Sequence, residues 1–217
     1  MKKTIPAYGL WCFGLTMLVL SGVGCSNPAS NAPDAEVGDA VSVSDSNRGE
    51  APTGFTYVID ETSTIEFVGA KVTGIHDGGF DSFDGSIKLI ADDPTQSSIE
   101  LNIDATSIWT DNEKLTGHLK SPDFFEVETY PTAVFQSTSI VAAEDGGFDV
   151  TGNLNLHGVE KSITFPATIV LGHGTVTATA EFSIKRFDFG IVYPGAKDNL
   201  IKDEVLIRFN LTATPAT

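Results

Sequence analysis

The chain has 217 residues and a strongly acidic balance, with 29 Asp and Glu against 13 Lys and Arg and a formal net charge of −16. Such a surface repels nucleic acids and anionic lipid surfaces, so we expect no nucleic-acid partner. The region 53–217 has the length of one domain.

The N-terminus has the layout of an export signal. Lys2 and Lys3 form a positive region, the stretch 7–20 is apolar, and the small residues 21–24 follow. This order predicts cleavage on export. A retained transmembrane helix is the alternative, but the apolar stretch is shorter than the ~20 residues that span a bilayer, and it contains glycines. Removal of both lysines lowers the charge of the mature chain to −18 (−16 minus 2).

The two cysteines point to a lipid anchor. Cys12 lies inside the apolar signal, so Cys25 has no intramolecular partner after cleavage and no internal disulfide can form. A single cysteine that follows small residues at a signal junction resembles the acylated residue of a bacterial lipoprotein. We therefore predict that 1–25 is a lipoprotein-type signal and that Cys25 anchors the protein on the periplasmic side of a bacterial membrane. Cleavage nearby without a lipid is the alternative.

Residues 26–52 are rich in Ala, Ser, Asp, Asn, Gly and Pro and show no periodic apolar pattern. This composition predicts a disordered tether. As a random coil the tether would span about 25–30 Å, enough to hold a domain clear of a membrane surface.

From Phe55 onward, apolar and polar residues alternate with a period of two, which is typical of strands with one buried and one wet face. Turn signals such as Asp-Gly-Gly and Asp-Asp-Pro separate the runs. Only 111–120 looks helical, as a short crossover capped at Thr110 or Asp111. Long strands and short turns predict an all-β antiparallel sheet that closes on itself, although periodicity alone does not separate a barrel from a sandwich. The clearest alternating runs are 99–106, 176–185 and 205–213.

Catalytic motifs are missing from the sequence. It contains no Gly-x-Ser-x-Gly elbow, no His-Glu-x-x-His and no glycine-rich dinucleotide loop. The segment 158–162 superficially resembles a phosphate loop, but it lacks the Gly-Lys-Ser ending and no helix is predicted after it. The four histidines are too dispersed for metal-ligand spacing, and His76 and His173 are expected to be solvated turn residues. We expect a non-catalytic protein without a metal site.

Four segments, in chain order, have a recognisable pattern: GAKVTGIHDG (69–78), DNEKLTGHLKSPDFFEVETYPTAVFQS (111–137), VTGNLNLHGV (150–159) and RFDFGI (186–191). Together they resemble the signature of the YceI-like family, secreted bacterial proteins that bind isoprenoid lipids. The resemblance implies an extended, lipocalin-like antiparallel β-barrel of about eight strands with an apolar cavity. It also implies that the protein sequesters or transports a long-chain isoprenoid, such as a polyprenyl phosphate or quinone, or a similar amphiphile in the cell envelope.

Strand parity, the abundance of Phe (14 copies) and this resemblance give the candidate site residues. Arg186 is the candidate to meet a phosphate or quinone oxygen, and a salt bridge to Asp188 or another acid is its alternative role. The candidate head-group contacts are His118, Lys120, Arg186 and Tyr193. The candidate apolar cavity residues are Ile103, Trp109, Phe124, Phe125, Phe182, Ile184 and Phe209.

Two other functions remain open at this point. One is a ligand-free structural or interaction barrel of the envelope, filled by its own side chains. The other is a metal- or haem-handling accessory protein. We expect no cofactor beyond a bound isoprenoid or quinone-like lipid, and the sequence leaves open whether the chain forms a homodimer.

Overall fold

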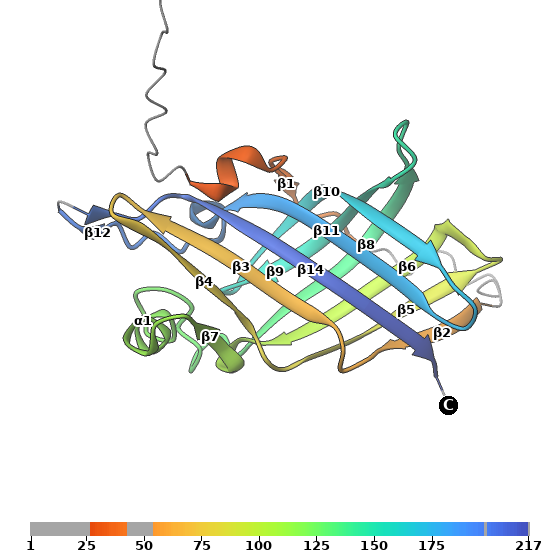
Figure 1. Cartoon of the computed structure of the whole chain (residues 1–217), viewed down its shortest axis with the longest axis horizontal. Helices are drawn as coiled ribbons and strands as arrows, with labels where there is room; N and C mark the ends of the chain where they lie inside the picture. The colour runs from red at the N-terminus through yellow and green to blue at the C-terminus, as the bar shows by residue number, and fades with distance from the viewer. Residues whose placement is uncertain (1–26, 43–53, 198, 217) are drawn as a thin grey trace, which may run out of the picture.

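The computed structural model describes residues 27–42, 54–197 and 199–216. Most of them form one antiparallel β-sheet rolled into an elongated barrel (Figure 1). In chain order the elements are η1 (Pro28–Asn31), β1 (Glu36–Asp39), β2 (Gly54–Ile59), β3 (Thr64–Lys71), β4 (Gly74–Phe80), β5 (Phe83–Ile90), β6 (Asp93–Asp104), η2 (Ala105–Ser107), β7 (Ile108–Thr110), α1 (Glu113–Leu119), β8 (Thr132–Ala142), β9 (Phe148–Leu156), β10 (Val159–Leu171), β11 (Val176–Lys185), η3 (Arg186–Phe189), β12 (Gly195–Ala196), β13 (Asn199–Leu200) and β14 (Glu204–Pro215).

The strand order is β1-β10-β9-β8-β6-β5-β2-β14-β3-β4-β7, and β11 closes the barrel by pairing with both β10 and β14. β14 pairs with β2 at one end and with β3 at the other, because β2 and β3 are two parts of one bent strand. β4 pairs with β3 and β5 pairs with β2, so β4 and β5 together form the next strand of the barrel. β7 pairs with β4 and β6 pairs with β5, so β6 and β7 together form the strand after it. The result is the closed eight-stranded barrel that the sequence predicts.

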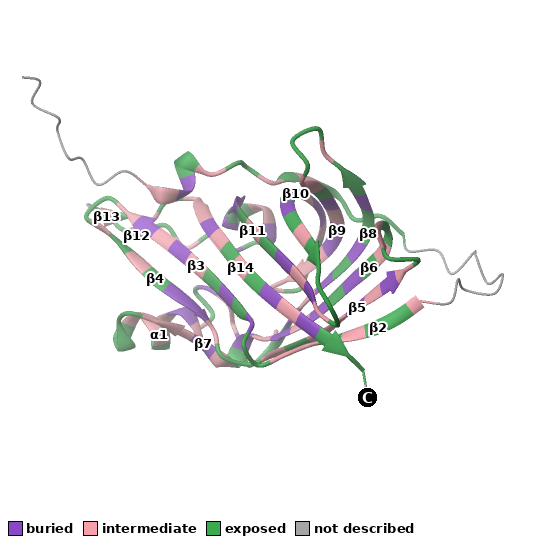
Figure 2. Ribbon diagram, turned by 45° about the vertical axis from the view of Figure 1, so that its right-hand side comes forward, coloured by how far each residue is buried: buried purple, intermediate pink, exposed green. Residues whose placement is uncertain are grey.

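The alternating runs place one face of each strand inside the barrel. β11 and β14 pair over ten residues, with Phe182 opposite Ile207 and Ala180 opposite Phe209. Buried and exposed bands alternate along both strands in Figure 2. At Gly152 a side chain is excluded, because a Cβ atom there would collide with the ring of Phe135. The ring of Phe135 therefore lies directly on the backbone of the neighbouring strand β9.

One end of the barrel is sealed by a packed apolar cluster. This is the end with the C-terminus in Figure 1, opposite α1. The side chains that fill it are almost fully buried, so little space is left for water or a ligand. The cluster includes Ile87, Leu89, Ile140, Val176 and Ala213.

At the other end, α1 and the segment after it bridge β7 and β8. The cap of α1 is Asn112, whose side chain accepts a hydrogen bond from the Leu115 N–H at 3.1 Å, so the prediction of a cap at Thr110 or Asp111 is wrong. Thr110 instead accepts a hydrogen bond from the Asn112 N–H at 3.2 Å. Asn112 takes the role because its extended backbone lets the side chain reach back over the first turn.

The prediction that 26–52 is a disordered tether is wrong for residues 27–42. β1 pairs antiparallel with β10, from Glu36 opposite Thr164 to Asp39 opposite Lys161. Just before β1, the Ala35 N–H donates to the Ser183 carbonyl of β11 at 2.8 Å. β10 and β11 pair with each other only over 168–171 and 176–179, so the N-terminal segment fills the gap where they diverge.

The composition of this segment gives no sign of its packing, because most of the segment is held by backbone hydrogen bonds to two open strand edges, which do not depend on the side chains. η1 adds a small apolar contact in which Ala29, with no exposed surface, covers Val68 and Leu206. In the alternating run 205–213, Leu206 occupies an outward position, yet it is only 1 % exposed because η1 lies over it. The predicted signal 1–25, with Cys25, and residues 26 and 43–53 lie outside the described residues.

Within the described residues, no helix has both the length and the apolar character needed to cross a membrane.

Candidate ligand cavity

The barrel encloses an elongated cavity of about 460 Å³. Pockets of roughly 300–1,000 Å³ accommodate small-molecule ligands. On β11 the cavity wall runs from Ala178 to Ile184, a distance of about 20 Å along an extended strand. The shape therefore suits a long, narrow ligand.

Four phenylalanines form an aromatic cluster in the middle of the cavity wall. Phe165 and Phe182 stack with their ring centroids 4.3 Å apart and an interplanar angle of 8°. Phe135 and Phe209 approach Phe165 at centroid distances of 5.6 Å and 5.8 Å. These rings offer apolar contacts without hydrogen-bonding requirements, so they can hold a flexible hydrocarbon chain in many conformations.

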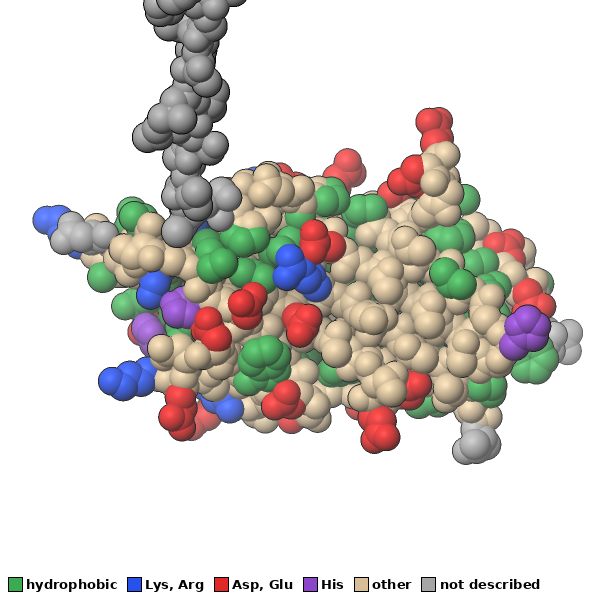
Figure 3. All heavy atoms as spheres, viewed as in Figure 1, with side chains coloured by type: hydrophobic (Ala, Val, Ile, Leu, Met, Phe, Trp, Pro, Cys, Tyr) green, Lys and Arg blue, Asp and Glu red, His purple; other side chains and the backbone are tan. Residues whose placement is uncertain are grey.

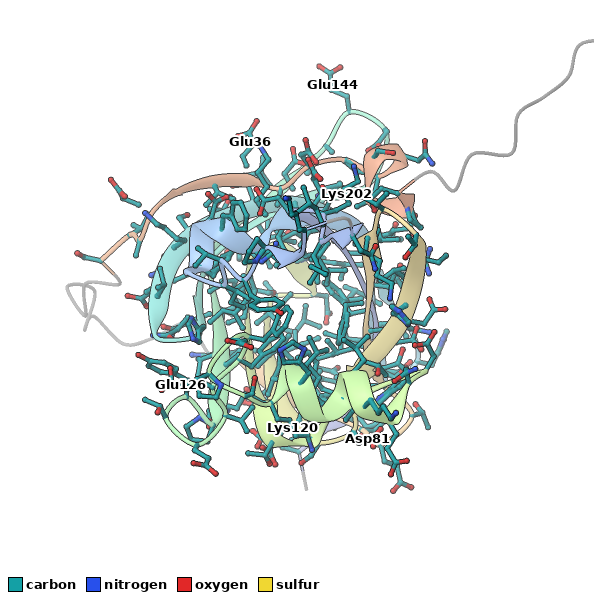
Figure 4. All side chains as sticks on the ribbon, turned by 90° about the vertical axis from the view of Figure 1, so that its left-hand side faces the viewer. Glu36, Asp81, Lys120, Glu126, Glu144 and Lys202 are labelled. Carbon is teal, nitrogen blue, oxygen red and sulfur yellow. The ribbon has the colours of Figure 1, made fainter. Side chains whose placement is uncertain are left out.

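The polar part of the cavity wall is confined to the end that carries α1, which we call the mouth. Figure 4 looks into this end, with α1 across its lower part and Lys202 labelled near the upper rim. The cavity thus has an apolar interior and one polar end, which matches an amphiphilic molecule with its head group at the mouth. The polar wall residues are Lys71, His76, Asn112, His118, Arg186, Tyr193 and Asn199.

His118 and Tyr193 meet at the mouth with Phe124. The His118 ring lies 5.0 Å from each of the other two rings, centroid to centroid, and the rings of Phe124 and Tyr193 are 5.2 Å apart. Nε2 of His118 is 2.8 Å from the Asp123 carboxylate, which fixes the orientation of the imidazole. The cluster combines an apolar surface with polar tips, so it can contact the junction between a head group and its chain.

Arg186 is 5 % exposed, and its side chain donates hydrogen bonds to three backbone carbonyls. Its Nη1 donates to Ile191 at 2.7 Å, its Nε to Lys202 at 3.0 Å and its Nη2 to Ile201 at 3.4 Å. Burial lowers the pKa of this guanidinium, and the charge of Asp203 opposes the shift. Arginine stays protonated in proteins and has five N–H groups, so two remain for a ligand or water.

These contacts decide between the roles considered for Arg186. Among the described residues it forms no ion pair with Asp188, so the predicted alternative of a salt bridge to that residue is wrong. The carbonyls belong to the turn after η3 and to the segment that leads into β14. Arg186 therefore fixes the backbone beside the mouth, while its side chain also forms part of the cavity wall.

Most of the candidate residues lie in the cavity wall, but Trp109 and Lys120 do not. The indole of Trp109 lies against β4, where a Cβ on Gly79 would come within 2.9 Å of it. Lys120 caps the C-terminal end of α1, where its N–H closes the last turn. The candidates in the wall are Ile103, Phe124, Phe125, Phe182, Ile184 and Phe209 from the apolar set, and His118, Arg186 and Tyr193 from the head-group set.

Sequence reasoning missed four polar residues at the mouth, Lys71, His76, Asn112 and Asn199. His76 was expected in a solvated turn, but it lies on β4 in the cavity wall, with Nδ1 2.8 Å from the Asp111 carboxylate. Its place in the GAKVTGIHDG segment was an available signal, since Lys71 lies on the adjacent strand of the same hairpin. No sequence signal indicated Asn199.

The described residues contain no group of three or more His, Cys, Asp and Glu side chains that could hold a metal ion.

Comparison with known proteins gives a consistent family assignment. A family model described as the YceI-like domain matches residues 57–213. A UPF0312 protein of Pseudomonas putida is 33% identical over 162 residues, which cover 70% of this chain and 84% of the relative. A UPF0312 protein of Azotobacter vinelandii is 34% identical over 118 residues, covering 52% of this chain and 62% of the relative.

Two solved structures share the fold. Burkholderia cenocepacia BcnA matches with a TM-score of 0.66 and 28% identity, over 72% of this chain and 99% of that one. A Saccharophagus degradans protein, described as a polyisoprenoid binding domain implicated in plant cell wall breakdown, matches with a TM-score of 0.60 and 22% identity. That match covers 76% of this chain and all of the other (100%).

Proposed function

We propose, since the chain belongs to the YceI-like family, that it binds a long-chain isoprenoid or a similar amphiphilic lipid inside its barrel and catalyses no reaction on it. The observation that carries this proposal is the division of the cavity into a long apolar interior and one polar mouth. The description of a related fold as a polyisoprenoid binding domain supports the same ligand class.

The energetics of such a site are those of apolar burial. Each buried methylene contributes about 0.8 kcal/mol, so a chain of about ten buried carbons contributes about 8 kcal/mol. Immobilising the ligand offsets about 4 kcal/mol or more of this gain. An apolar wall discriminates weakly between chains that differ by one carbon. We therefore expect the protein to select a class of ligand and to accept several chain lengths within it.

The polar mouth sets the direction of binding. The hydrocarbon chain extends toward Phe165 and Phe182, and the head group stays beside His118 and Tyr193. With acylation at Cys25, such a protein would sequester or carry lipid at the surface of an envelope membrane. The open interior favours this function over a structural barrel filled by its own side chains.

Native mass spectrometry of the full chain, purified in a mild detergent, tests the proposal. We expect a co-purified lipid that leaves on collisional activation, and binding of added isoprenoid at micromolar concentration to a delipidated sample. A chain that carries no lipid and binds none would refute the carrier function.

A matched set of variants on β11 tests the cavity itself. Phe182→Asp places a charge in the apolar wall at a cost of several kcal/mol, about 3 or more, and should abolish lipid binding. Phe182→Leu keeps the wall apolar and should retain lipid. Thr179→Asp lies on the exposed face of the same strand and should leave lipid content unchanged. Equal lipid content in folded samples of all three variants would contradict the assignment.

A further inference from the structure

Two hairpins at the mouth are joined into one unit, which we call the hairpin tip (residues 70–76, 194–197 and 199–202). The Val72 N–H donates to the Leu200 carbonyl at 3.1 Å. The N–H and hydroxyl of Thr73 both donate to the Asn199 side chain, at 3.2 Å and 2.9 Å. Lys71 also bridges to Ile201. Residues of both hairpins form part of the cavity wall, so the tip is continuous with the mouth.

The tip presents large apolar side chains to the outside. Val72 is 58 % exposed, Leu200 50 % and Ile75 45 %. Single exposed apolar residues are common on protein surfaces, but these three lie on hydrogen-bonded neighbours at the rim of a lipid-sized cavity. Ile75 and Val72 are outward residues of the β3–β4 hairpin, whereas its Lys71 and His76 line the cavity.

The charge of the tip is opposite to that of the chain. Residues 70–76 and 194–202 contain three lysines, Lys71, Lys197 and Lys202, and one aspartate, a formal charge of +2 (3 minus 1) within a chain of −16. Figure 3 shows basic side chains gathered at this end of the molecule. Basic residues beside exposed apolar ones are the combination that favours contact with anionic phospholipid head groups and the acyl layer beneath them.

The N-terminal segment leads to the same end of the barrel. Asn27 contacts the Glu204 carbonyl at 3.5 Å, and η1 lies on the outer wall formed by β3 and β14. Glu204 is two residues beyond Lys202 of the tip. Cys25 precedes Asn27 by two residues, which span at most about 7 Å. An anchor at Cys25 would therefore hold this end near the membrane, whereas a 27-residue tether (26–52) would leave every orientation open.

We propose that the hairpin tip docks on the surface of the bilayer, with Val72, Ile75 and Leu200 entering the interfacial layer and the lysines beside the phosphates. The mouth then opens onto the membrane, and a lipid can pass between bilayer and cavity with little exposure to water. This inference rests on the proposed function for the identity of the cargo, but docking has its own readout.

Fluorescence quenching in vesicles tests the orientation. Val72→Cys and Leu200→Cys, made in the full chain, are labelled with bimane and added to phosphatidylethanolamine–phosphatidylglycerol vesicles that contain lipid brominated in its acyl chains. Val141→Cys and Val170→Cys serve as controls, because their parent residues are similarly exposed (56 % and 54 %) at the sealed end. The wild-type chain, treated with bimane in the same way, gives the background. We expect several-fold stronger quenching at the tip than at the sealed end.

A second measurement removes the contribution of the anchor. In vesicle flotation of the Cys25→Ser chain, Val72→Asp combined with Leu200→Asp should weaken binding about tenfold, as expected when two apolar contacts are lost. Val141→Asp combined with Val170→Asp should leave binding unchanged. Equal quenching at both ends, no binding to vesicles, or equal effects of the two double variants would overturn the proposal.

Lipid content, measured separately by native mass spectrometry, distinguishes the two proposals. Lipid retained without tip quenching refutes docking alone, and tip quenching without any bound lipid refutes the proposed function alone.

Discussion

Asn153→Ala should release residues 39–42 from the outer wall of the barrel. The Asn153 side chain is buried on β9 and forms hydrogen bonds with both the N–H and the carbonyl of Val41. Its Oδ1 accepts from the Val41 N–H at 2.9 Å, and its Nδ2 donates to the Val41 carbonyl at 2.7 Å. The substitution removes both hydrogen bonds and leaves β9 otherwise intact.

The expected loss is the net value of two neutral hydrogen bonds, about 1–3 kcal/mol. No further penalty arises on the Val41 side, since that residue is 50 % exposed and its backbone groups can bind water. For a domain of this size the loss corresponds to a decrease in Tm of about 2–12 °C. Differential scanning calorimetry of the purified protein measures it directly.

Two controls make this prediction specific. Asn155 lies two residues along the same face of β9 and its side chain forms no hydrogen bond to another described residue, so Asn155→Ala should change stability by less than about 0.5 kcal/mol. In a chain that begins at Thr53, Asn153→Ala should have no effect, because its partner is absent; the two changes form a double-mutant cycle. An unchanged Tm for Asn153→Ala, or the same decrease with and without residues 27–42, would refute the packed N-terminal segment.

Two further predictions concern the anchor and the mouth. Cys25→Ser should move the protein from the detergent-soluble membrane fraction to the soluble envelope fraction, and identical soluble behaviour of wild type and variant would contradict lipid attachment. Arg186→Gln should lower the free energy of unfolding by about 2–4 kcal/mol, because it removes the charged donor from buried carbonyls. The exposed neighbour Lys185 gives the control variant Lys185→Gln, and equal denaturation midpoints for the two variants would show that the carbonyl contacts of Arg186 contribute nothing.

The sequence by itself determined the barrel and the inward face of its strands. Alternation is a local property, since successive side chains of a strand point to opposite faces whatever the strand pairs with. Ile103, Phe182, Ile184 and Phe209 therefore lie in the cavity wall as their parity indicates. The choice between barrel and sandwich came from the four family-like segments and is confirmed by the closed pairing of β10, β11 and β14.

The alternation of inward and outward residues predicts burial wrongly where another segment covers the outer face of a strand. Leu206 and Ser183 occupy outward positions, yet both are buried because η1 and residues 33–35 lie over them. Nothing in the composition of 27–42 indicates this contact. It depends on β10 and β11 diverging, which leaves hydrogen-bonding groups on two strand edges unpaired until the N-terminal segment pairs with them.

The polar mouth was decided by tertiary structure alone. Lys71, His76, His118 and Asn199 come from three separate parts of the chain, and they share one opening only because strand register and barrel stagger bring those parts to the same end. Arg186 was recognised in the sequence, but its carbonyl partners were not, since they belong to loops whose path depends on the packing around them. Local periodicity fixes which way a side chain points, whereas the closing of the barrel fixes which side chains meet.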